Sequence, residues 1–290
     1  MFFKGKIIAP VFARVAYSVL KLAGWKRGTV LANAKLVAGA VPLGALNYDT
    51  LLKNLTRHAS ELLFRFGTFK KLPHDFTAYP CRVDGWDFAL DEATIPVLEK
   101  MRKGGIFLTA HYGNYEAMGP WLCRLGIPLV ASYIPVKPKW LNNILERKIR
   151  SVDDRSYSVD ARTPRDFIRI LNEGNLFCLL SDQDSRIPSA LSGTLLGQPV
   201  NVNPLPDFLL KHRPQTPVFI CWMEERGASP KDASSKKVRV LHAIEVGGAQ
   251  SKVVEKFNKW LEERIYENPN LWYSFTHRRF YSQSPEIYGG

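Results

Sequence analysis

The sequence predicts an α/β fold: a single domain with a mainly parallel central sheet flanked by helices, preceded by an N-terminal amphipathic helical segment. From about residue 80 onward, short apolar runs alternate with helical patterns, which is the rhythm of a parallel sheet. Before residue 70, apolar residues recur three or four positions apart, as on one face of a helix. The chain has 290 residues, 46% of them hydrophobic, and can therefore bury a sizeable core. We expect a helical, membrane-associating segment over residues 1–70 and an α/β domain over residues 71–290.

The first expected helix runs from Ile7 to Leu22 and has one apolar face. Its apolar residues are Ile7, Ile8, Val11, Phe12, Val15, Val19 and Leu22, bordered by the cations Lys4, Lys6, Arg14, Lys21, Lys26 and Arg27. Such a helix can lie in the headgroup layer of an anionic bilayer, although a terminal helix packed on the protein would show the same pattern. A second pattern, from Tyr48 to Phe66, predicts a helix of the core or of a groove wall. We expect neither a transmembrane helix, which needs about 18 apolar residues, nor a signal peptide.

Strands and helices are expected to alternate in the rest of the chain. The expected strands are Cys81–Val83, Trp86–Leu90, Gly105–Ala110, Pro128–Tyr133, Leu176–Leu180, Pro217–Trp222 and Val238–Ile244. The expected helices are Asp91–Arg102, Asn114–Leu125, Lys139–Arg150, Pro164–Asn172 and Lys252–Tyr266. The Pro-rich stretch Ile187–Pro206 is expected to be a loop, and Glu224–Lys237 a surface loop between two antiparallel strands.

The charge of the chain predicts an anionic partner. The formal net charge is +13, which suits nucleic acid, an anionic membrane surface, a phosphorylated substrate or an acidic carrier protein. No nucleic-acid-binding motif is present, so nucleic acid is the least favoured of these. The four cysteines, Cys81, Cys123, Cys178 and Cys221, are widely spaced, and no dinucleotide or phosphate loop occurs. We therefore expect free thiols, no metal site and no cofactor.

The most informative segment, residues 104–116, reads Gly-Gly-Ile-Phe-Leu-Thr-Ala-His-Tyr-Gly-Asn-Tyr-Glu. Its apolar strand delivers His111 to the carboxyl edge of the sheet, where open α/β folds place their ligands. Gly113 permits a tight turn, Asn114 can cap the next helix, and Glu116 then falls in the first helical turn. At such a corner Glu116 can fold back onto one nitrogen of His111, leaving the other to take a proton from a hydroxyl. Backbone N–H groups around Gly113 and Asn114, or a nearby arginine, could stabilise an oxyanion. A histidine that merely caps a strand end would leave the same pattern.

Several motifs occur in a characteristic order. They are Val83–Trp86, residues 104–116, Tyr133, the Arg147/Arg150 pair, Ser181–Asp184, Pro269–Trp272 and His277–Phe280. Together they resemble the bacterial lipid A late acyltransferase family, the lauroyl and myristoyl transferases with an HX4D/E motif. The resemblance implies a glycerol-phosphate-acyltransferase-like fold and transfer of a fatty acyl chain from acyl carrier protein or acyl-CoA to a hydroxyl of a lipid A precursor. It implies no metal, and it makes His111 and Glu116 the expected catalytic pair.

The candidate substrate-binding residues are Gly113, Asn114, Tyr133, Arg147, Arg150, Asp182, Gln183, Asp184, His277 and Arg278. The two aspartates follow a buried strand, where carboxylates bind substrate, orient basic groups or cap the chain locally. The arginines, three apart on a helix, could face one phosphate of a lipid or of a carrier's phosphopantetheine, or lie on a solvated face. His277 and Arg278 could anchor the chain at a bilayer or form ion pairs with the protein.

These observations predict a peripheral O-acyltransferase at the cytoplasmic face of the bacterial inner membrane. His111 would act as general base and Glu116 would orient it. No GxSxG or Cys/His signature of a nucleophilic enzyme is present. Two other interpretations stay open: acylation of another membrane glycolipid or a lysophospholipid, and a non-enzymatic basic lipid-binding protein.

Overall fold

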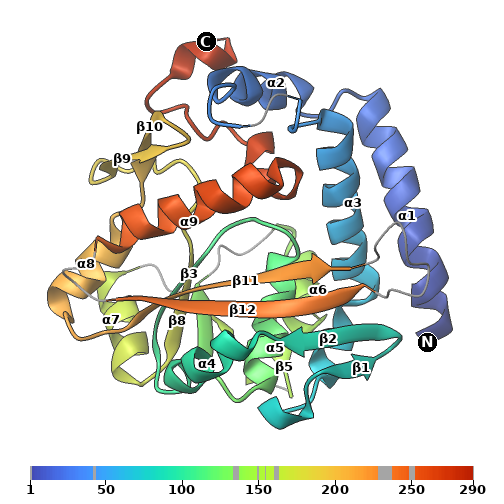
Figure 1. The fold of residues 1–290 in the computed structure, drawn as a ribbon, viewed down its shortest axis with the longest axis vertical. Coiled ribbons are helices and arrows are strands. Elements are labelled where there is room, and N and C mark those ends of the chain that lie inside the picture. The colour runs from blue at the N-terminus through green and yellow to red at the C-terminus, as the bar shows by residue number, and fades with distance from the viewer. Residues whose placement is uncertain are drawn as a thin grey trace.

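The computed structural model describes residues 2–41, 44–132, 137–148, 150–153, 155–159, 163–227, 237–247 and 252–289. The strands of its main sheet are β1 (Cys81–Val83), β2 (Trp86–Leu90), β3 (Gly105–Thr109), β4 (Leu129–Ser132), β7 (Ser158–Val159), β8 (Leu176–Leu180), β11 (Val218–Arg226) and β12 (Val238–Gly247). Within the described residues they lie in the order β1-β2-β12-β11-β3-β8-β4-β7, and five of the seven pairings are parallel. The mainly parallel sheet is confirmed, and β11 and β12 are antiparallel as expected (Figure 1).

Helices flank the sheet and precede it. The α-helices are α1 (Phe2–Leu22), α2 (Arg27–Leu36), α3 (Tyr48–Phe64), α4 (Ile95–Met101), α5 (Met118–Arg124), α6 (Lys139–Lys148), α7 (Pro164–Asn172), α8 (Leu205–His212) and α9 (Val253–Glu267). The 3-10 helices are η1 (Phe66–Lys71), η2 (Phe76–Ala78), η3 (Glu92–Thr94), η4 (Tyr115–Ala117), η5 (Pro269–Leu271), η6 (Tyr273–Thr276) and η7 (Pro285–Tyr288). The expected helix 91–102 divides into η3 and α4, and the expected helix 114–125 into η4 and α5.

Two hydrophobic cores cover the two faces of the sheet. On β3 every residue is buried, and alternate side chains enter different cores, because successive residues of a strand point to opposite faces. Ile106 and Leu108 pack in the core that contains the apolar face of α9, whereas Phe107 packs with α4 and α5. A central strand covered on both faces explains why 105–110 reads as a continuous apolar run.

The expected loop over 187–206 is wrong. In its place β9 (Leu191–Leu195) and β10 (Gln198–Val202) form a hairpin, and α8 begins directly after Pro204. Leu196 and Gly197 at the turn both have positive φ, which is the geometry of a two-residue hairpin turn. Prolines suggested a loop, but Pro206 lies in the first turn of α8, where its missing N–H costs nothing. A small second hairpin joins β5 (Ser151–Val152) to β6 (Arg155–Ser156).

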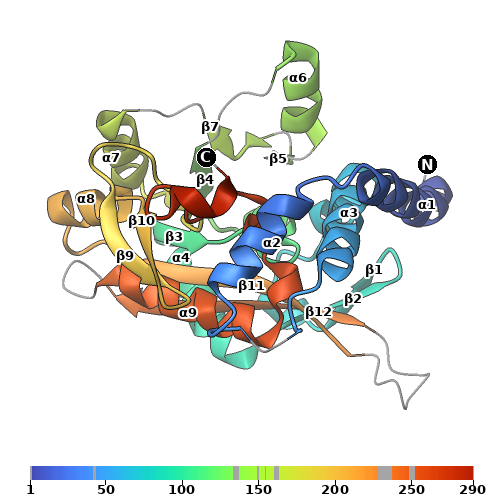
Figure 2. The same cartoon turned by 90° about the horizontal axis from the view of Figure 1, so that it is seen from above.

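The N-terminal helices α1 and α3 lie side by side in both views (Figures 1 and 2). Lys21 of α1 forms an ion pair with Asp49 of α3 at 2.7 Å, and Ser60 of α3 donates to the carbonyl of Ala9. Another face of α1 exposes an apolar row, Ile8, Val11, Phe12, Val15, Val19 and Leu22. At its edge, the ring of Phe12 also contacts Phe64 of α3, with centroids 5.2 Å apart. In the described part of the chain, no helix combines the length and the apolar character needed to cross a membrane.

The turn before β3 generates a test of this fold. Gly104 has φ +85°, and a Cβ there would collide with the carbonyl of Gly174. Gly104→Ala is therefore expected to destabilise the protein by more than about 1 kcal/mol, measured by urea unfolding. Gly28, in α2, has open space around its Cα, and Gly28→Ala is expected to be neutral or stabilising by up to about 1 kcal/mol. Equal unfolding midpoints for both variants would contradict this packing.

Candidate active site

His111 lies at the carboxyl edge of the sheet, just beyond β3. Strand β8 pairs with β3 in parallel, so both strands end at this edge and Asp182, which follows β8, meets His111. The Nδ1 atom of His111 is 2.8 Å from Oδ1 of Asp182, and the backbone N–H of His111 donates to Oδ2 at 3.0 Å. The side chain of Asp182 is fully buried, whereas 19% of the His111 side chain is exposed. The histidine is thus the accessible member of the pair.

Asp182 is held by four hydrogen bonds. Besides the two from His111, Oδ2 accepts from the indole Nε1 of Trp272 at 2.8 Å and the hydroxyl of Ser274 at 2.7 Å. Burial alone would raise the pKa of this carboxyl. The charge of His111 and the hydrogen bonds outweigh burial, and the pKa of Asp182 lies well below its ordinary value. Asp182 is therefore ionised at neutral pH.

The ionised carboxylate determines the tautomer of His111. A carboxylate can only accept, so Nδ1 carries the proton and Nε2 of the neutral ring keeps a lone pair. Burial by itself lowers the pKa of His111, but the charge and hydrogen bond of Asp182, together with the charge of Glu116, raise it above the ordinary value. The ring can therefore accept a proton at Nε2 and has a favourable environment for the resulting cation.

Glu116 does not hold Nδ1, and the expectation that it would is wrong. The neighbouring strand β8 brings Asp182 to that nitrogen, whereas Glu116 lies one turn further along η4. Glu116 remains in the site, because its charge raises the pKa of His111. Its own pKa is raised by burial, against the attraction of Arg150 and His111. The ring of Tyr115 packs edge-on against His111, with centroids 4.9 Å apart.

The turn after His111 is bound to the C-terminal segment. Gly113 has φ +58°, which confirms the predicted tight turn, and its N–H donates to the carbonyl of Leu271 at 2.9 Å. The carbonyl of His111 accepts from the N–H of Tyr273 at 2.9 Å. The N–H of Gly113 is therefore occupied, which removes it from the expected oxyanion donors.

Asn114 begins η4 but its side chain does not cap this helix, so that expectation is wrong. Its Nδ2 donates to Glu61 of α3 at 2.8 Å, and its Oδ1 accepts from His58 of the same helix at 3.1 Å. The side chain is thus directed to α3, away from the N–H groups of η4.

The other predicted residues divide between the site and its surroundings. Arg150 follows the end of α6 and is half-buried, and its charge opposes the rise that burial causes in the pKa of Glu116. Arg147, on α6, is exposed. Asp184 does not cap the chain locally: its Oδ2 accepts from the N–H and hydroxyl of Ser282, in the C-terminal segment, at 3.2 and 2.8 Å. Gln183 is exposed.

The predicted C-terminal residues lie on the exposed side. The pKa of His277 is lowered, mainly by burial and also by the charge of the nearby His111. Arg278 lies over the rings of Tyr281 and Tyr288, 5.6 and 5.8 Å from their centroids. Tyr133 lies outside the described residues.

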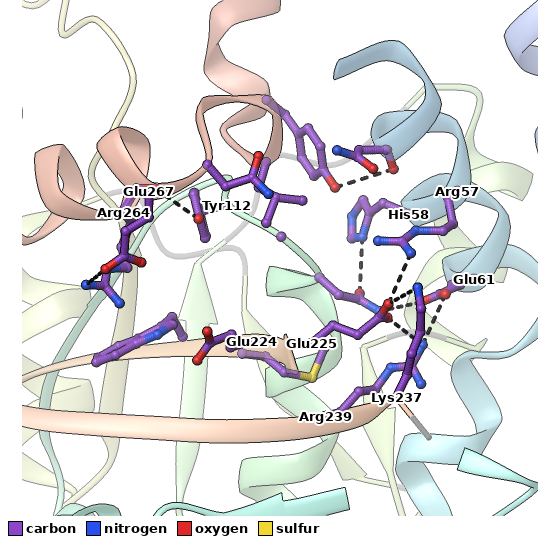
Figure 3. Close-up of a pocket in the computed structure, with 18 residues that line it drawn as sticks. Arg57, His58, Glu61, Tyr112, Glu224, Glu225, Lys237, Arg239, Arg264 and Glu267 are labelled. Carbon is purple, nitrogen blue, oxygen red and sulfur yellow. Dashed lines mark hydrogen bonds and ion pairs between the residues drawn. The ribbon is translucent and has the colours of Figure 1, made fainter. Parts of the chain in front are cut away.

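A cavity of about 380 Å³ adjoins the turn and is lined partly by Tyr112, Gly113 and Asn114. Figure 3 shows charged side chains around it: Arg57 and Glu61 come from α3, Glu224 and Glu225 from β11, Lys237 and Arg239 from the start of β12, and Arg264 and Glu267 from α9. Arg57 and Lys237 pair with Glu225, and Arg239 with Glu61 and Glu225. In the described residues no cluster of three or more His, Cys, Asp or Glu side chains is arranged to hold a metal ion.

Sequence reasoning missed four contributors to this site. Trp272 belonged to a recognised motif, but its hydrogen bond to Asp182 and that of Ser274 were not predicted. His58 and Glu61 lie three apart in a predicted amphipathic helix that contains many other polar residues. The sequence therefore gave no local signal that separated these two residues from the rest of the polar face.

The sequence of the chain is similar to that of a known protein family. A family model described as bacterial lipid A biosynthesis acyltransferase matches residues 6–282. The match includes the N-terminal helices, both residues of the His111–Asp182 pair and the segment that carries Trp272. A search of curated proteins found no match.

The His111–Asp182 pair predicts a change in titration. Asp182→Asn is expected to lower the pKa of His111, because the charge that favours the imidazolium is lost, and to destabilise the protein by about 1–3 kcal/mol. NMR titration of the ring and urea unfolding measure these effects. Asp153, in an exposed ion pair with Arg124, supplies the control: Asp153→Asn is expected to change neither quantity appreciably. An unchanged pKa of His111 in Asp182→Asn would contradict the pairing.

The same pair predicts how stability depends on pH. The pKa of Asp182 is lower in the folded than in the unfolded protein, so its stabilisation is present above the unfolded value of about 3.9 and is lost as the pH falls through the folded value. The difference in unfolding free energy between the native protein and Asp182→Asn should therefore shrink below about pH 4. Urea unfolding over a pH series measures it, and a difference that grows on acidification would refute the depressed pKa.

Proposed function

The chain belongs to the bacterial lipid A biosynthesis acyltransferase family, and on that premise we propose that it moves a fatty acyl chain from acyl carrier protein or acyl-CoA onto a hydroxyl of a lipid A precursor. Membership of the family supports an acyltransferase. The donor, the acceptor and the residue roles below are our proposals. The reaction takes place at the cytoplasmic face of the bacterial inner membrane, to which the protein binds peripherally.

The observation that carries the mechanism is the hydrogen bond between His111 and Asp182. Because Asp182 engages Nδ1, Nε2 removes the proton of the acceptor hydroxyl while the hydroxyl oxygen attacks the thioester carbonyl. The tetrahedral intermediate then expels the thiolate, which takes the proton back from the imidazolium. The products are an ester and a free thiol, and no covalent acyl-enzyme is required because the thioester is already activated.

Neighbouring charges support this step. Asp182 and Glu116 both favour the imidazolium that forms during the attack. Arg150, whose charge acts on Glu116, is placed to bind an anionic group of the substrates, and His277, whose pKa is lowered, can donate a hydrogen bond from its neutral ring. Arg278 is exposed near them and adds to the same positive region.

The membrane is the proposed source of the acceptor. The exposed apolar row of α1 and the formal net charge of +13 suit a helix that lies in the headgroup layer of an anionic bilayer. An acidic acyl carrier would dock on the same positive field.

Substitution of the base tests the mechanism. His111→Asn keeps a donor for Asp182 but has no basic nitrogen, so transfer is expected to fall by about 10²–10⁴-fold while the protein stays folded. The assay follows a labelled acyl chain from acyl carrier protein to a lipid A precursor. His212→Ala, at an exposed position on α8, is the control and should retain native activity. Native activity in His111→Asn would overturn the mechanism.

The acceptor is tested in the same assay. Transfer to other glycolipids or to lysophospholipids, but not to a lipid A precursor, would replace the proposed acceptor. If neither acyl carrier protein nor acyl-CoA supports transfer to any of them while the protein binds vesicles, a non-enzymatic lipid-binding function would be favoured.

Substitutions on α1 test the membrane contact. Val15 is 58% exposed in the middle of the apolar row, and Val15→Asp is expected to weaken co-sedimentation with anionic vesicles at least about tenfold, since a buried valine contributes about 1.5 kcal/mol. Ser18→Asp adds the same charge at an exposed position of the helix that is already polar and should have a smaller effect. Equal effects of the two variants would show that charge alone, rather than an inserted apolar face, accounts for binding.

A further inference from the structure

The side chain of Asn114 is shared between the turn that carries His111 and helix α3. Glu61 accepts from Nδ2 at 2.8 Å and His58 lies 3.1 Å from Oδ1, although both residues precede Asn114 by more than fifty positions. His58 is 7% exposed, and the side chain of Glu61 is 14% exposed. Because these contacts are in the interior, both polar atoms of the Asn114 amide, Nδ2 and Oδ1, are held in place.

The direction of these hydrogen bonds is determined by chemistry. A carboxylate only accepts, so the nitrogen of the Asn114 amide faces Glu61 and its oxygen faces His58. His58 must then donate from Nδ1. Burial lowers the pKa of His58 to about 4, so its ring is neutral at pH 7 and this one tautomer satisfies Asn114.

Aromatic contacts extend this arrangement to His111. The ring of His58 lies between those of Tyr115 and Tyr273, with centroids 5.1 and 5.4 Å away. Tyr115 in turn packs edge-on against His111 at 4.9 Å. A shift of His58 would therefore displace the Tyr115 ring that packs against His111.

The carboxylate of Glu61 is supported by the buried Arg239 and by the more exposed Arg57. Burial raises its pKa, and the charges of Arg239 and Arg57 oppose that rise. Arg239 lies 3.2 Å from Glu61, and its guanidinium stacks on Trp86 at 3.3 Å from the ring centroid. Arg57, Glu61 and Arg239 line the charged cavity (Figure 3). Their ion pairs therefore also stabilise the carboxylate that binds Asn114 in the His111 turn.

We propose that α3 positions the His111 turn through a clamp on Asn114, formed by Glu61 and His58. Asp182 binds Nδ1 of the imidazole, and the clamp acts on the same residue through the backbone of the turn at Asn114 and through the ring of Tyr115. Glu61, His58 and Asn114 are thus positioning residues for the transfer reaction. This inference rests on the proposed function of His111.

Removal of the clamped amide is the first test. Asn114→Ala is expected to lower kcat about 10–100-fold, because a small misplacement of the base is costly, and to leave KM nearly unchanged, since substrate binding is not the step affected. The ring ¹⁵N signals of His111 should also shift in the substrate-free protein.

The matched control is Asn258→Ala. Asn258 on α9 is 5% exposed, and its amide donates to the carbonyl of Thr194 at 2.9 Å. This variant should lose a comparable amount of stability in urea unfolding while retaining native kcat and native His111 signals.

Conservative replacement of His58 supplies the rescue. His58→Asn presents an amide donor close to the position of Nδ1 and should keep kcat within about threefold of native, whereas His58→Leu removes the donor and should behave like Asn114→Ala. Loss of kcat in both His58 variants in proportion to lost stability would indicate a purely structural role and overturn the proposal.

The NMR readout separates this inference from the proposed function. If His111→Asn remains active, the general-base mechanism fails, but the His111 signals still report whether Asn114 positions the ring. Unshifted His111 signals in Asn114→Ala, together with native kcat, would overturn the clamp whatever the reaction is. Shifted signals with a lowered kcat and an unaffected Asn258→Ala support it.

Discussion

The site depends on one buried carboxylate, that of Asp182. An ion removed from water costs several kcal/mol unless its lone pairs are filled, so every donor around it must be in place in the folded protein. These donors come from two regions: the end of β3 supplies His111, and the C-terminal segment supplies Trp272 and Ser274. The requirement to satisfy Asp182 thus fixes the position of the C-terminal segment, which in turn holds the His111 turn through backbone hydrogen bonds to Gly113 and His111.

The N-terminal helices complete this arrangement. Asn33 of α2 donates to the carbonyls of Phe275 and His277 at 2.8 and 2.9 Å, and Asn270 binds the backbone of Asn47 and Ala45 just before α3. The segment that carries the donors of Asp182 is therefore held on its other side by residues near the N-terminus. Residues 1–70, predicted as a membrane-associating segment, also form part of the wall of the site.

The sequence predicted the central strands and most helices because their signals are local. A buried strand such as 176–180 is a continuous apolar run, and a surface helix repeats its apolar residues every three or four positions.

The order of the strands in the sheet, by contrast, is not a local property of the sequence. Asp182 and His111 are 71 positions apart, so their hydrogen bond follows from the pairing of β8 with β3. Reasoning along the chain selected Glu116, the nearest carboxylate in sequence, as the partner of His111. It identified Asp182 as a residue that could bind substrate, orient a basic group or cap the chain. The hairpin of β9 and β10 was missed because Gly193 and Pro199 lie inside its strands, where Gly and Pro usually indicate a loop.

The two carboxylates near His111 lie in different environments, and this difference distinguishes their roles. Asp182 receives four hydrogen bonds, and its pKa is lowered despite complete burial. The pKa of Glu116 is raised, because burial outweighs the attraction of Arg150 and His111. Asp182 therefore stays ionised and can fix the tautomer of His111 throughout a reaction, whereas the charge of Glu116 depends on the cations beside it. A cation that forms on His111 would favour ionisation of Glu116, whose negative charge in turn favours the imidazolium. His111 thus has one neighbouring carboxylate that stays ionised and one whose ionisation depends on nearby cations. This arrangement suits a base that gains and then returns a proton in each turnover.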